Sequence, residues 1–317
     1  MQGVNTNQSM SCLRIIHETT YRYAKPVHFG PHRLVLRPRE GHDLRVEEMN
    51  LQISPDYDLE WSRDVFGNSV ATAYFFSPSD RLNIKSTLLL NQTNAFPRRS
   101  DRPVQRPKYP LQFSPIEEAI AAAYRGSTFS DDAARVAEWL RGEIDPSSYA
   151  EAETLAAAVN QKVRRTIGYQ RREEKGVQSP GETLAAGSGS CRDLAALVLE
   201  CWRALGFPAR FASGYLDCAA SEAGRASTHA WAEVYLPEVG WIGFDPTLGA
   251  LTSSQHVVTG VSNHPRGVMP ITGTFYGERD LFEGMEVSVR TRRIEHSSGG
   301  AQNVTIFRPP PLAMGAA

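Results

Sequence analysis

Three residues in the second half of the chain carry the side chains that nucleophilic thiol chemistry requires: Cys191, His229 and Asp245. In that chemistry a thiolate attacks, an imidazole accepts and returns the proton, and a carboxylate orients the imidazole. Cys191 follows the flexible segment GSGS (187–190), and the N-terminus of a helix favours an anionic sulfur. These residue types in this order are candidates for nucleophile, general base and orienting carboxylate.

A predicted helix begins at the thiol. Apolar residues return at helical spacing after Cys191, and Gly206 ends the pattern, which predicts a helix over 191–205. The free N–H groups of its first turn could stabilise an oxyanion, and the preceding glycines would let a substrate backbone approach closely.

A predicted hairpin carries the other two residues. Alternating stretches predict strands over 209–219, 229–237 and 240–247. A tight turn between the last two strands would bring His229 beside Asp245 at one edge of the sheet. If the helix packs on this sheet, its first residue points at the imidazole.

The remaining chain divides into regions that differ in their pattern of apolar and polar residues. Short alternating stretches with turn signals predict an antiparallel β domain at the beginning, and a Pro- and Arg-rich segment separates it from a part with helical patterns at 130–144 and 149–169. A further alternating stretch, 285–295, predicts another strand. The predicted units are the β domain at 11–95, a linker at 96–113, a catalytic core at 114–295 and a flexible tail at 296–317.

Composition excludes several classes of protein. The 317 residues carry a formal net charge of −1, which does not favour nucleic acid or an acidic membrane as a partner. No apolar run approaches a membrane span and no signal peptide is evident, so we expect a cytoplasmic protein. The four cysteines form no CxxC pair, which argues against a disulfide scaffold or a structural zinc site.

Two regions resemble known families. Residues 157–250 are similar to the transglutaminase-like core, a papain-like thiol fold, through IGYQ, GSGSCRDLAALVLECWRALGFPARFASGYL and THAWAEVYLPEVGWIGFDPT. Residues 13–95 resemble the β-rich N-terminal domain that accompanies this core in bacteria, through HETTYRYAKPV, LRPR and DVFGN. The resemblance implies an α+β protein: an N-terminal antiparallel β domain followed by a papain-like transglutaminase core of helices packed on an antiparallel sheet.

The resemblance also implies roles for residues. Cys191 would be the nucleophile, His229 the general base and acid, and Asp245 the orienting carboxylate. Asp193 occupies a position typical of the branch, where it would face the helix dipole or brace the loop. The expected cleft or support residues are Tyr169, Gly189, Ser190, Asp193 and Trp231. His256 follows closely and could line the cleft.

The expected reaction is attack on an amide carbonyl of a protein or peptide substrate. The resulting thioester would be resolved by an amine, giving acyl transfer, or by water, giving hydrolysis, without metal or cofactor. A cysteine peptidase or amidase would use the same triad, and a catalytically silent peptide-binding module would only keep the fold. The N-terminal β domain argues against acetyl transfer from a CoA-type donor. The sequence does not decide the oligomeric state.

Overall fold

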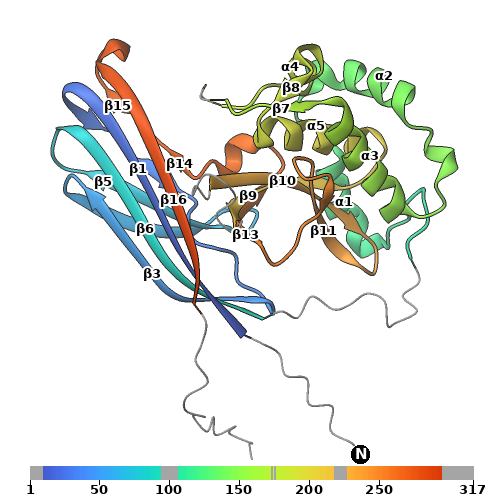
Figure 1. Ribbon diagram of the computed structural model, residues 1–317, viewed down its shortest axis with the longest axis horizontal. Coiled ribbons are helices and arrows are strands. Elements are labelled where there is room, and N and C mark those ends of the chain that lie inside the picture. Colours follow the sequence, from blue (N-terminus) through green and yellow to red (C-terminus); the bar gives the residue numbers. More distant parts are fainter. Residues whose placement is uncertain (1–9, 94–105, 173, 175, 218–226, 295–317) are drawn as a thin grey trace, which may run out of the picture.

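The computed structural model describes residues 10–93, 106–172, 174, 176–217 and 227–294. Long strands form one side of the molecule, and helices covering a second sheet form the other (Figure 1). Most of the predicted linker and all of the predicted tail at 296–317 lie outside the described residues. The α+β class expected from the sequence is confirmed.

Two antiparallel sheets pack face to face in the N-terminal part, which we call the N-terminal sandwich. One has the order β15-β1-β6-β3, with β16 also paired to β1, and the other has the order β14-β2-β5-β4. Their facing side chains form one apolar cluster that includes Leu34, Leu82 and Ile84. The strands are β1 (Met10–Phe29), β2 (His32–Leu34), β3 (Leu44–Ser54), β4 (Tyr57–Arg63), β5 (Ser69–Phe75), β6 (Ser79–Thr93), β14 (Ile271–Thr272), β15 (Phe275–Tyr276) and β16 (Phe282–Ile294).

The C-terminal strands correct the predicted domain boundary. The sequence assigned everything from 114 to 295 to the core, including the strand expected at 285–295. That strand is β16, which pairs with β1 from Cys12 opposite Ile294 to Tyr23 opposite Phe282. Alternation of side chains indicates a strand but not its partner, so the sequence could not show that the chain returns to the first sheet.

In the second part of the chain, helices pack on an antiparallel sheet. The sheet has the order β12-β11-β10-β9-β13. Its strands are β9 (Ala209–Leu216), β10 (Ser227–Leu236), β11 (Gly240–Asp245), β12 (Ala250–Leu251) and β13 (His256–Ser262). The helices are α1 (Pro115–Arg125), α2 (Ala133–Glu143), α3 (Ala152–Thr166), α4 (Pro180–Ala186) and α5 (Cys191–Ala204), with 3₁₀ turns at Ser130–Asp132, Pro146–Ser148, Pro265–Val268 and Arg279–Leu281. A short parallel pair, β7 (Gly168–Tyr169) and β8 (Ser188–Gly189), lies beside α5.

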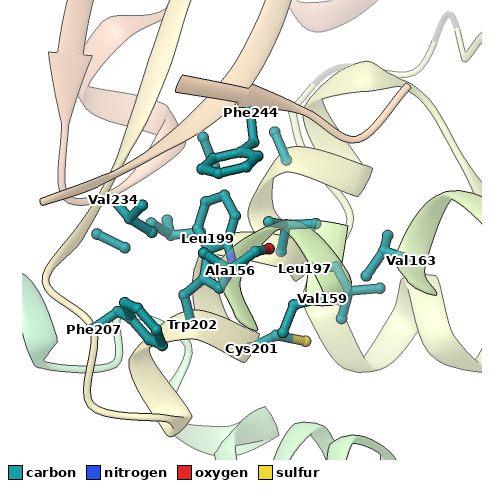
Figure 2. Packing of buried hydrophobic residues seen from close by; sticks show 14 of the residues in the cluster. Ala156, Val159, Val163, Leu197, Leu199, Cys201, Trp202, Phe207, Val234 and Phe244 are labelled. Atoms are coloured by element: carbon teal, nitrogen blue, oxygen red, sulfur yellow. The ribbon is translucent and has the colours of Figure 1, made fainter. Parts of the chain in front are cut away.

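Helix α5 is the centre of this part. Its side chains from position 193 to 203 are buried, because α2 and α3 cover one side and the sheet covers the other. Trp202 packs edge-on against Phe244 of β11, and its indole N–H donates to the Ala156 carbonyl of α3 at 3.1 Å (Figure 2). This packing fixes the direction of α5 and therefore the position of its first residue.

The helix expected at 130–144 is shorter than predicted. A 3₁₀ turn occupies Ser130–Asp132, and α2 begins at Ala133 with Asp132 as its N-cap residue. The Asp132 side chain instead accepts a bond from the Gly181 N–H of α4 at 2.8 Å. In the part of the chain that the structure describes, no helix is long and apolar enough to cross a membrane.

Candidate active site

Cys191 is the first residue of α5 and is half-buried. Ser190 precedes it in extended conformation, and a capping box links Ser190 with Asp193. In this box both the N–H and the hydroxyl of Ser190 donate to Asp193 Oδ2 at 2.8 Å. The first N–H groups of a helix have no acceptor within the helix. The Cys191 N–H can therefore donate to a negatively charged oxygen on a group bound to the sulfur.

Asp193 braces the loop before the thiol, one of the two roles expected from the sequence. Its side chain is fully buried and accepts bonds from the Gln178 N–H at 2.8 Å and from the Arg172 guanidinium at 2.9 Å. A Cβ at Gly189 would lie 2.8 Å from the Asp193 Cβ, so only glycine fits there. The Asp193 carboxylate therefore holds the loop that presents Cys191 through its bonds with Ser190, Gln178 and Arg172.

His229 and Asp245 meet as the hairpin predicted, although β10 begins two residues earlier than expected. His229 Nε2 lies 2.7 Å from Asp245 Oδ2, and both side chains are buried. With Nε2 directed at the carboxylate, Nδ1 is the ring nitrogen left to face Cys191, and the thiol is near enough to the ring to help raise the pKa of His229. The structure thus brings the three candidate residues together.

Asp245 is bonded on both carboxylate oxygens. Its Oδ1 accepts from the backbone N–H groups of Thr247 at 2.8 Å and Leu248 at 3.3 Å, and its Oδ2 accepts from His229 and His256. The Asn160 amide of α3 also donates to the Asp245 carbonyl at 3.3 Å. An aspartate held in this way keeps both its ionised form and its orientation.

The charges of the pair follow from these bonds. Burial alone would lower the pKa of His229, but the hydrogen bonds with Asp245 and Cys191 outweigh it and raise the pKa to about 10. Burial would raise the pKa of Asp245, yet the hydrogen bonds from His229 and His256 hold it well below the usual range for a carboxyl. The site therefore favours an imidazolium between a carboxylate and the sulfur.

The other expected residues divide between the site and its support. Tyr169 is 51% exposed and pairs across β7 and β8 with Gly189, close enough for burial and the Cys191 charge to raise the pKa of its phenol. Trp231 supports the site from the core, because it is buried in a small apolar cluster. The centroid of its ring lies 5.2 Å from the centroid of the His256 ring. Tyr169 is therefore an exposed aromatic residue near Cys191.

The sequence predicted only that His256 could line the cleft, whereas the structure places it in contact with Asp245. Its Nε2 lies 3.1 Å from Asp245 Oδ2, and its ring is nearly buried. The only sequence signal was its position shortly after the triad, and its contact with Asp245 depends on how β13 packs in the sheet.

The two histidines and Asp245 lie close enough to form a candidate metal site, but the hydrogen-bond pattern does not fit one. The Ser253 N–H donates to His256 Nδ1 at 3.1 Å, so the ring carries its proton on Nε2. A metal ligand needs an unprotonated nitrogen at that position. The cluster is therefore suited to hydrogen bonding rather than to holding a cation.

A helix-borne thiol beside a sheet-borne imidazole and carboxylate defines the papain-like class of thiol proteins. Residues 13–91 match the bacterial transglutaminase-like N-terminal region, and residues 146–246 match the transglutaminase-like superfamily. These two matches confirm the resemblance to the transglutaminase-like family and to its bacterial N-terminal region. The second match contains Cys191, His229 and Asp245, whereas His256 lies beyond it.

The relatives are similar to this chain across most of their length. An uncharacterized protein of Mycobacterium tuberculosis is 27% identical over 276 residues, covering 83% of this chain and 87% of the relative. One from Mycobacterium leprae is 23% identical over 290 residues, covering 84% and 93%. The crystal structure of a cysteine protease candidate from Cytophaga hutchinsonii superposes with a TM-score of 0.66 at 16% identity, over 89% of this chain and 91% of that one. At that identity the likeness concerns the fold.

Proposed function

We propose that this protein is a transglutaminase-like cysteine enzyme that cleaves an amide bond through a thioester. The Cys191 thiol transfers its proton to His229, and the sulfur attacks the amide carbonyl carbon. The Cys191 N–H stabilises the tetrahedral oxyanion. His229 then gives the proton to the departing amine as the C–N bond breaks, and Asp245 keeps the ring oriented and stabilises its imidazolium form until that transfer.

The single observation that carries the proposal is the bonding of His229. One ring nitrogen is 2.7 Å from a fully buried carboxylate, and the partly exposed Cys191 interacts with the ring so that the pKa of His229 is raised. A cysteine whose only role is packing in the core has no use for a protonated imidazole beside its sulfur. Cys201, on the same helix, shows the contrast, because burial strongly raises the pKa of its thiol.

Two resolutions of the thioester belong to the proposal. An amine nucleophile would regenerate the thiol and give a new amide, and water would give a free acid. The site has the same groups for both, so the choice depends on which nucleophile reaches the thioester past Tyr169. The substrate class we propose is a protein or peptide amide, and a cytoplasmic location also stays a prediction.

A labelling experiment tests the nucleophile first. Iodoacetamide at about pH 6, where an ordinary free thiol reacts slowly, should modify Cys191 and leave the buried Cys201 unmodified, as mapped by mass spectrometry. His229→Ala should slow the labelling of Cys191. A Cys191 that ignores the reagent would favour the silent peptide-binding module instead.

Turnover is tested with a peptide library, with and without a primary amine. Mass shifts that need the amine indicate acyl transfer, and shifts that appear without it indicate hydrolysis. Cys191→Ala and His229→Ala should abolish both, whereas Asp245→Ala should lose less because the carboxylate only orients and stabilises the imidazole. Retained turnover in either of the first two variants would contradict the mechanism.

A further inference from the structure

His256 is fixed in one tautomer by its neighbours. The Ser253 N–H donates to its Nδ1 at 3.1 Å, so the proton lies on Nε2 and is donated to Asp245 Oδ2 at 3.1 Å. Trp231 packs against the ring edge-on at 5.2 Å. The bond from Ser253 occupies Nδ1, so Nε2 is the nitrogen that donates to Asp245.

We propose that His256 is a positioning residue that orients Asp245 toward His229, and that the N-terminal sandwich holds His256 in place through strand β13. The inference rests on the function proposed above and adds a fourth residue to that site. Asp245 Oδ2 accepts from two rings, one on β10 and one on β13, while the backbone N–H groups of Thr247 and Leu248 hold Oδ1. Without His256, Oδ2 would keep only the His229 ring as its donor, and the carboxylate would be held less firmly toward His229.

The anchor of β13 comes from the N-terminal sandwich. Strand β13 ends the sheet, with β9 on one side. On its other side the fully buried Asn68 amide accepts from the Val261 N–H at 2.9 Å and donates to the Val261 carbonyl at 2.8 Å. The Arg39 N–H donates to the Val258 carbonyl at 2.8 Å. Asn68 and Arg39 thus take the place of a missing neighbouring strand.

A third contact reaches the turn that fixes the tautomer. Gln92, near the end of β6, donates to the Ser254 carbonyl at 3.0 Å, next to the Ser253 N–H that holds His256. The Arg39 guanidinium also donates to Asn68 at 2.7 Å and keeps its amide in this orientation. The sandwich therefore holds both β13 and the turn before it, which explains why it packs against the catalytic sheet at this edge.

Two substitutions of His256 separate positioning from packing. His256→Gln keeps a donor at the place of Nε2, whereas His256→Leu keeps an apolar contact with Trp231 but cannot donate. We expect His256→Leu to slow iodoacetamide labelling of Cys191 at about pH 6 by about tenfold, the worth of one hydrogen bond. His256→Gln should keep most of the wild-type rate, and for any substrate found the loss in His256→Leu should fall on kcat rather than KM.

The results separate the inference from the function on which it rests. A leucine variant that matches wild type, or one that outperforms glutamine, would mean that His256 only packs and would overturn the inference while leaving the enzyme intact. A wild-type Cys191 no more reactive than free glutathione would contradict the proposed function and this inference with it. Circular dichroism and thermal melts of each variant show whether the fold is kept.

A double-mutant comparison tests the route through the sandwich. Asn68→Ala should slow Cys191 labelling in the wild-type background and add little in the His256→Leu background, because both act on the same carboxylate. Asn83→Ala removes bonds to Glu18 and Thr20 inside the sandwich, away from β13, and should leave the rate unchanged. Equal effects of Asn68→Ala in both backgrounds would overturn the proposed route.

Discussion

Replacing Asp193 with alanine tests whether one buried carboxylate holds the loop that presents the thiol. The side chain accepts from the N–H groups of Ser190 and Gln178 at 2.8 Å and from the Arg172 guanidinium at 2.9 Å. An unpaired buried donor costs about 1–3 kcal/mol, and breaking a buried ion pair from one side costs about 3–5 kcal/mol. These losses concern the same carboxylate and overlap, so we expect Asp193→Ala to lower the free energy of unfolding by about 4 kcal/mol.

Urea denaturation followed by tryptophan fluorescence measures this loss, with iodoacetamide labelling of Cys191 as a second measurement. Asp193→Asn keeps the shape but turns amide hydrogens toward the donors, so its loss should be intermediate. Asp145→Ala is the matched control, because that exposed carboxylate accepts from the Ser147 N–H in a surface turn. The reasoning is refuted if Asp193→Ala is no more destabilised than the control and Cys191 is labelled at the wild-type rate.

Three other substitutions probe the site and its support. The raised pKa of His229 means that its protonated form stabilises the fold fully below pH 6.5 and that this contribution is lost as the pH approaches about 10; urea melts across that range should show the slope in wild type and not in His229→Gln. Gly189→Ala should slow Cys191 labelling, because the new Cβ would lie 2.8 Å from that of Asp193. Trp202→Phe loses the indole bond to α3 and should lower the unfolding free energy by about 1–3 kcal/mol in the same melts.

The local features of the site could be predicted from the sequence. A helix that begins at Cys191 and a hairpin that joins His229 to Asp245 are set by apolar spacing, a Gly stop and a tight turn, all within short windows. Those patterns place the thiol at a helix N-terminus and the other two side chains at one sheet edge. The structure agrees on the helix bounds to one residue and brings the three together.

The features that the sequence did not reveal depend on contacts between distant segments. His256 reaches Asp245 because β13 adds to the far side of β9, and Asn160 reaches it from α3. Neither pairing leaves a periodic signal near the residues concerned. The strand at 282–294 was recognised as a strand but assigned to the wrong unit for the same reason. Asp193 was expected at the site only through the resemblance, and its capping box with Ser190 is a local motif that the structure revealed.

The pairing of β16 with β1 also has a consequence for folding during synthesis. During synthesis β6 can pair with β1 early, but the opposite edge of β1 gains its long neighbour only when residues 282–294 leave the ribosome. The whole part that carries the candidate site emerges while that edge is open, and an open strand edge is a template for pairing with another chain. A nascent chain halted before β16 should therefore aggregate more readily than one released with it.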